Sequence, residues 1–119
     1  MKPRALRHLI IGLLMGTGIF HLTVALLGLG AGLGLPLTIF GLIYLVISFY
    51  VRRDTNDGSK SHSRNAIIAA IAACTIGLTI GGSIYISNGG PVALPIMFMI
   101  DIIIIVAGVM WLLKVRAKT

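Results

Sequence analysis

Residues 92–113 read VALPIMFMIDIIIIVAGVMWLL, an apolar run in which Asp101 is the only charged side chain. A membrane-spanning helix needs ~20 predominantly apolar residues, so this segment has the length and composition of one. An ionised side chain near the bilayer centre costs at least ~2.5–3.5 kcal/mol on insertion scales. The segment therefore predicts a transmembrane helix, together with a partner, a proton or water that compensates Asp101.

The composition of the whole chain agrees with this interpretation. Of the 119 residues, 57% are hydrophobic and 11% are charged, whereas a soluble domain carries roughly 25% charged residues. Two long tracts lack Lys and Arg, residues 9–51 and 66–113, and each leaves room for two spanning helices. The prediction is an all-α integral membrane protein with four transmembrane helices in one domain, residues 1–119. The predicted helices are residues 9–29, 33–51, 66–87 and 92–113.

A cleaved signal peptide is the alternative for the first segment, because basic residues precede it. The apolar stretch is too long for that class, and no small-residue cleavage site ends it. We therefore expect the first segment to remain as a helix.

The basic residues predict how the chain is oriented. All ten lie in three groups: Lys2, Arg4 and Arg7; Arg52, Arg53, Lys60 and Arg64; Lys114, Arg116 and Lys118. The two other connections, around residues 30–35 and 87–91, carry no charge. Because cytoplasmic loops are enriched in Lys and Arg, we expect both termini and the loop 52–65 to be cytoplasmic, in a bacterial inner (plasma) membrane.

The net charge of +7 would suggest nucleic acid as a partner if the protein were soluble. Here the basic groups flank membrane segments, and no interleaving of aromatic and basic residues supports binding to nucleic acid. We expect the lipid bilayer as the partner of these charges, and no nucleic acid.

The predicted helices form two hairpins that resemble each other weakly. Arg7 followed by Ile10-Ile11 recurs as Arg64 followed by Ile67-Ile68, an offset of 57, and Leu35-Pro36 recurs as Leu94-Pro95, an offset of 59. At the second offset Leu42 takes the place of Asp101. Since both hairpins begin and end on the same side, a repeat would be parallel and not inverted. Chance coincidence between apolar helices is the alternative.

Small residues predict where helices pack closely, because they let backbones approach each other in lipid. The predicted packing positions are Ala69, Ala73, Gly77 and Gly81 in the third helix, and Gly12 and Gly16 in the first. The interface that they predict lies either within the bundle or between protomers.

Two strongly titratable side chains lie deep in the predicted membrane segments, His21 and Asp101. Each is thirteen residues from a basic residue at the cytoplasmic boundary, a height of ~20 Å at 1.5 Å per residue. Equal height permits a pair, in which the imidazole donates to the carboxylate or the two share a proton. Thr17 and Tyr44 are the candidates for extending this pair into a polar path.

Other kinds of site find little support in the residue pattern. No nucleophile elbow or phosphate loop is present, and the loop 52–65 is too short for a catalytic domain, so we expect no enzyme. No His, Cys, Asp and Glu residues have the spacing of a metal site. A bis-histidine haem would need two copies of His21 in a homodimer, and we expect no cofactor. The single Cys74 is expected to be a small packing residue.

Two functions from different classes remain. The first is a structural, accessory or assembly subunit that binds other membrane helices, in which Asp101 and His21 lock the helices or dock a partner. The alternative is a small proton-coupled transporter that uses Asp101 and His21, and a chain of this size would need to be a homo-oligomer to form a conduit. An Asp101→Asn variant separates the two functions, since it would stop proton-dependent flux in one and assembly in the other.

Overall fold

The computed structural model describes residues 3–28, 34–53, 60–90 and 92–117, and this part of the chain is almost entirely helical. Its helices are α1 (Pro3–Leu26), α2 (Gly34–Arg53), α3 (Lys60–Asn88) and α4 (Ala93–Ala117). All four are long and apolar enough to cross a membrane. The predicted all-α class and the four long apolar helices are therefore confirmed, and all four helices are candidate membrane spans.

The helices extend beyond the apolar segments from which they were predicted. α1 begins at Pro3 instead of residue 9, and α3 begins at Lys60 instead of residue 66, inside the predicted loop. An apolar run marks the lipid-facing length, whereas a helix continues into water as long as its residues tolerate the helical backbone. The predicted boundaries at residues 29 and 33 lie outside the described residues, as do positions 54–59 of the loop.

Two turns mark where helices end on the side that carries no basic residues. Gly28, after α1, and Gly89, directly after α3, both have a φ of 70°. This left-handed conformation is common after a helix C-terminus, and glycine adopts it without strain. Gly89 lies within the connection expected around residues 87–91, whereas Gly28 lies one residue before the end of the predicted helix 9–29.

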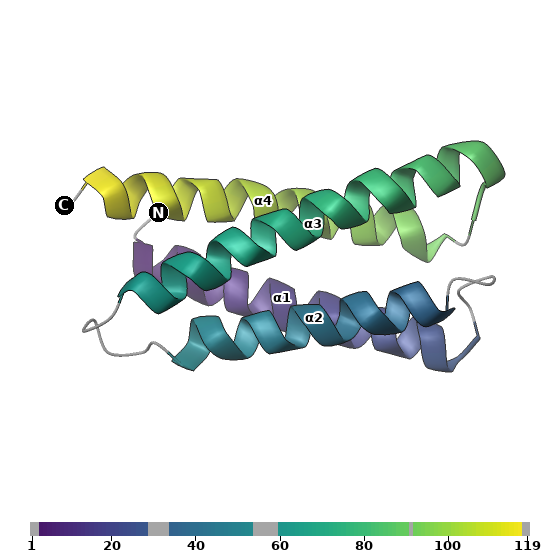
Figure 1. Ribbon diagram of the computed structural model, residues 1–119, viewed down its shortest axis with the longest axis horizontal. Coiled ribbons are helices and arrows are strands. Elements are labelled where there is room, and N and C mark those ends of the chain that lie inside the picture. The colour runs from purple at the N-terminus through teal and green to yellow at the C-terminus, as the bar shows by residue number, and fades with distance from the viewer. Residues whose placement is uncertain (1–2, 29–33, 54–59, 91, 118–119) are drawn as a thin grey trace.

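The helices pack as two pairs, α1 with α2 and α3 with α4, and α1·α4 and α2·α3 contacts join the pairs (Figure 1). The bundle therefore has the ring order α1–α2–α3–α4, which places α2 diagonally opposite α4. Its long axis measures 46 Å, close to the ~40–45 Å of a bilayer with its headgroups. The starts of α1 and α3 and the ends of α2 and α4 lie at one end, which we call the basic end.

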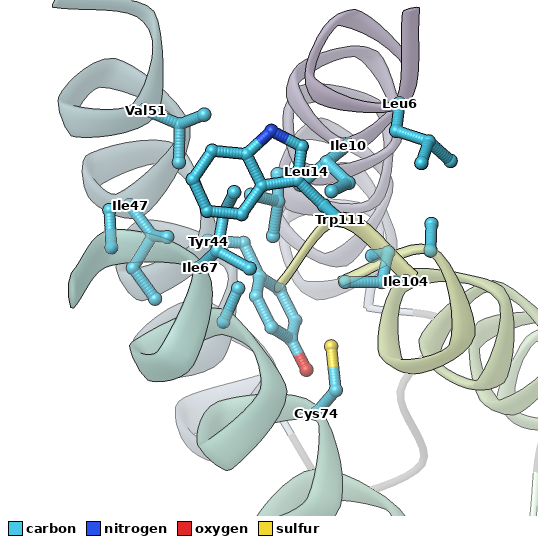
Figure 2. Close-up of a cluster of buried hydrophobic side chains, with 13 residues drawn as sticks. Leu6, Ile10, Leu14, Tyr44, Ile47, Val51, Ile67, Cys74, Ile104 and Trp111 are labelled. Atoms are coloured by element: carbon cyan, nitrogen blue, oxygen red, sulfur yellow. The ribbon is translucent and has the colours of Figure 1, made fainter. Parts of the chain in front are cut away.

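A cluster of buried side chains from all four helices fills the half of the bundle nearest the basic end (Figure 2). Trp111 of α4 is its largest member, and the cluster also includes Leu14 of α1 and Ile47 of α2. A second, smaller cluster lies toward the opposite end, formed by Val24, Leu37, Leu94 and Met97. The bundle is thus packed at both ends. His21 and Asp101, described below, belong to neither cluster, whereas Tyr44 and Cys74 belong to the first.

A close approach between helix backbones joins α1 to α2. A Cβ atom placed on Gly41 would lie 3.0 Å from the carbonyl oxygen of Gly18, and one on Gly18 would lie 3.0 Å from that of Gly41. These two glycines let the helices touch. By contrast, Gly12 and Gly16 are exposed, with nothing within 4 Å of a Cβ on either. Their predicted role in packing therefore stays a prediction for a partner outside this chain.

The small residues of α3 divide between two faces. Gly77 faces Tyr44 and Asp101, and Gly81 faces the ring of Phe98, whereas Ala69 is exposed. Ala73 is half-buried and packs against the cluster of Figure 2. A further face of small and hydroxyl residues, which we call the hydroxyl face, is turned away from the bundle. Its members are Ala72, Thr75, Thr79 and Ser83.

Several positions that are buried in the first hairpin are buried again 57 residues later, in the second hairpin. Residues buried at both members of such a pair are Ile10 and Ile67, Thr17 and Cys74, Leu37 and Leu94, Tyr44 and Asp101, and Ile47 and Ile104. Leu42, which the alternative offset aligned with Asp101, is 52% exposed. The two hairpins therefore turn inward in the same register, and Tyr44 occupies in the first the position that Asp101 occupies in the second.

Candidate functional site

An internal cavity of about 60 Å³ lies among the four helices, with His21, Tyr44, Gly77 and Asp101 in its wall. The remaining wall is mostly apolar and includes Phe40, Leu37, Met97 and Phe98. This volume has room for a few water molecules. Pro36 and Ile80 also line the cavity and are exposed on the surface, so the cavity reaches the outside of the bundle beside α2 and α3.

Asp101 is 2% exposed and receives a hydrogen bond across the diagonal of the bundle. The Tyr44 hydroxyl of α2 donates to its Oδ1 over 3.2 Å. A carboxylate has about four acceptor positions, and within the described residues its side-chain partners are the Tyr44 hydroxyl and the Cys74 thiol of α3. The other oxygen, Oδ2, lies 3.7 Å from where a Cβ on Gly77 would be. Because Gly77 has no side chain, α3 can lie close to the carboxyl and to the Tyr44 hydroxyl, which would be 3.2 Å from a Cβ at this position.

His21 is 5% exposed and is held by its own helix. Its Nδ1 lies 2.7 Å from the backbone oxygen of Thr17 and 3.2 Å from the Thr17 hydroxyl. A carbonyl oxygen only accepts, so Nδ1 carries the hydrogen, and in the neutral ring Nε2 is then an acceptor. Nε2 has no hydrogen-bond partner in the described part of the chain. The ring packs edge-on against Tyr44, with centroids 5.2 Å apart at 68°.

The structure brings His21 and Asp101 to one cavity, but through Tyr44 and not by a direct bond. Within the described ranges no hydrogen bond joins the imidazole to the carboxylate, whereas Tyr44 contacts both. Helix height predicted that the two residues could meet, but it carries no information on which third side chain reaches the bundle centre. Thr17 and Tyr44, which were predicted to extend a polar path, both contact His21. Thr17 lies within hydrogen-bond distance of its Nδ1, and Tyr44 packs against its ring.

Cys74 of α3 also belongs to this group, although the sequence suggested only a packing role. It is fully buried, and its thiol interacts with the Tyr44 hydroxyl and the Asp101 carboxyl. Figure 2 shows the Tyr44 hydroxyl pointing toward the Cys74 sulfur. The offset of 57 residues is the sequence signal that could have placed Tyr44 and Cys74 in the site. It pairs Tyr44 with Asp101, and Cys74 with Thr17.

Among the described residues, no cluster of three His, Cys, Asp or Glu side chains could hold a metal ion. The site offers acceptors, one hydroxyl donor and apolar walls. Comparison with protein-family models, with curated proteins and with solved structures finds no match. The geometry of the site therefore carries the functional argument alone.

Proposed function

We propose that this small membrane protein is a proton-coupled carrier in which Asp101 takes up and releases a proton as a small solute occupies the cavity. One observation carries the proposal: a buried carboxyl lines a cavity that reaches the surface, and its partners, the Tyr44 hydroxyl and the Cys74 thiol, are both uncharged groups. Intramembrane acids are costly, and where they occur they commonly mark proton or ion pathways.

A purely structural role for Asp101 explains these contacts less well. A buried carboxyl that only locks helices is stabilised best when protein groups satisfy both of its oxygens. Here Oδ2 instead lies beside the space left by Gly77. Asp101 is also enclosed by helices of its own chain, so it is not available for docking another protein.

For the orientation, we propose that the basic end is cytoplasmic. Arg4, Arg52, Arg64 and Lys114 support this, since positive charge is retained on the cytoplasmic side. The cavity then lies toward the outer half of the membrane. An impermeant thiol reagent added to intact cells should label a cysteine placed at Ser87, and labelling at Arg52 instead would reverse the orientation.

The carrier is tested in proteoliposomes with a trapped pH-sensitive dye. A panel of small cationic, anionic and neutral solutes is added outside, and protein-free liposomes correct for passive movement. We expect at least one solute to move protons in a way that Asp101→Asn abolishes. Tyr50→Phe is the matched control, because Tyr50 is 48% exposed and outside the cavity. Proton movement that persists in Asp101→Asn, or its absence for every solute, would overturn the proposal.

An accessory or assembly subunit is the second candidate, and the hydroxyl face of α3 favours it. Its hydroxyls bond to backbone carbonyls one turn earlier, as in Thr79 to Thr75 and Ser83 to Thr79, which leaves a smooth surface that suits another helix. Thr79→Leu should break association with another membrane protein or a second copy, measured by size-exclusion chromatography with light scattering, and leave flux intact. If Thr79→Leu changes neither the mass nor the co-purifying proteins, this candidate fails.

A further inference from the structure

We infer that the solute held by the cavity is a small primary ammonium, ammonium itself or an alkylammonium of one or two carbons. The inference rests on the proposed function in that it names the chemical class bound at the same site. It follows from the hydrogen-bonding groups of the wall, from the size of the cavity and from its apolar lining.

The polar groups that face the cavity are acceptors in need of donors. Nε2 of His21 has a free lone pair, because in the neutral ring the hydrogen is on Nδ1, which donates it to the Thr17 carbonyl. Oδ2 of Asp101 is a second acceptor, and the Tyr44 oxygen is a third, since its hydrogen is already donated to Oδ1. A primary ammonium presents three N–H donors and one positive charge, and it complements this set. An anion or a ligand with only acceptors would leave these groups unsatisfied.

The walls restrict the rest of the ligand to a small apolar part. A volume of about 60 Å³ suits a solute of a few heavy atoms. Phe40 and Phe98 line the cavity, and aromatic rings attract cations as well as short alkyl groups. Gly77 keeps this space open, because a Cβ there would lie 3.2 Å from the Tyr44 hydroxyl and 3.7 Å from Oδ2 of Asp101.

The same site explains how a proton would be coupled to the ligand. The amine enters in its neutral form beside Pro36 and Ile80, where the cavity reaches the surface. When Asp101 is protonated, its O–H bond breaks and an N–H bond forms on the amine. The products are a carboxylate and an ammonium in contact, so no isolated charge has to cross lipid. The ammonium then leaves on the opposite side with this proton, and Asp101 takes a new proton from water on the entry side before the next amine binds, so each amine crosses together with one proton.

Binding is measured by isothermal titration of the purified full-length protein in detergent micelles. Methylammonium chloride and tetramethylammonium chloride serve as probes, since both carry one charge but only the first has N–H donors. We expect methylammonium to bind and tetramethylammonium to bind at least tenfold more weakly. Asp101→Asn should weaken methylammonium binding by about tenfold or more, the effect of one charge-assisted hydrogen bond.

Two further variants keep the test informative if Asp101→Asn does not fold. Gly77→Ala should also weaken methylammonium binding, because its methyl group occupies the space beside Oδ2, whereas Gly12→Ala should leave it unchanged. Equal binding of the two cations, or full binding by Gly77→Ala, would overturn the inference. Methylammonium binding without proton movement in liposomes would refute the carrier and not the ligand. Proton movement with a different solute, without methylammonium binding, would refute only the ligand.

Discussion

Replacing Tyr44 by phenylalanine removes one hydroxyl from the centre of the bundle and deletes the bond that joins α2 to Asp101 of α4. The donor and acceptor are 3.2 Å apart, longer than the ~2.5–2.7 Å of a strong O–H···O⁻ bond. The bond therefore belongs with ordinary interhelical hydrogen bonds in membranes, which average ~0.6 kcal/mol and reach ~1.7 kcal/mol. We expect a coupling free energy between Tyr44 and Asp101 of about 0.6–1.7 kcal/mol.

The coupling is measured with a double-mutant cycle of Tyr44→Phe and Asp101→Asn. Unfolding is followed by circular dichroism in mixed detergent micelles containing increasing sodium dodecyl sulfate, and the free energy of unfolding is extracted for each variant. The control cycle pairs Asp101→Asn with Tyr50→Phe, whose side chain is exposed, and it should give no coupling. A Tyr44–Asp101 coupling no larger than that of the control cycle would show that the bond does not join these helices.

Two further outcomes follow from the packing. Gly41→Ala should lower the free energy of unfolding by about 1–3 kcal/mol, because its methyl group meets the α1 backbone at 3.0 Å. The control variant Gly12→Ala should leave the free energy of unfolding unchanged. Equal effects of the two variants in the same unfolding assay would argue against the close approach. Cys74 should react with a maleimide only slowly in the folded protein, since its side chain is fully buried, and mass spectrometry should show fast reaction only after unfolding. Rapid labelling of the native protein would contradict the described position of Cys74.

The membrane class and the helix number follow from the sequence because hydropathy records directly what lipid demands of a helix. The helix ends do not follow from it. Pro3 and Lys60 begin helices within polar segments, where apolar length gives no signal. The connection at Gly89 could be placed between two apolar segments, whereas the turn at Gly28 falls inside the predicted helix 9–29.

The candidate site could be predicted only in part. His21 and Asp101 stand out because polar groups are rare in such segments, and their heights along the helices agree. The position of Tyr44 between α2 and α4 depends on rotation of the helices about their axes. In lipid, apolar residues cover both the inner and the outer faces, so hydropathy leaves this rotation undetermined. The same reason explains why Gly12 and Gly16 stood out in the sequence although Gly18 and Gly41 make the contact.

The most direct test of the central claim is to observe the Asp101 carboxyl by infrared spectroscopy of the protein in lipid. Difference spectra between the wild type and Asp101→Asn isolate its C=O stretching band from those of Asp54 and Asp57. The account predicts a protonated-carboxyl band that disappears reversibly as the pH rises and shifts promptly in D₂O, since the cavity reaches the surface. A band that ignores both pH and D₂O while the protein stays folded would mean that Asp101 is sealed in the bundle and exchanges no proton.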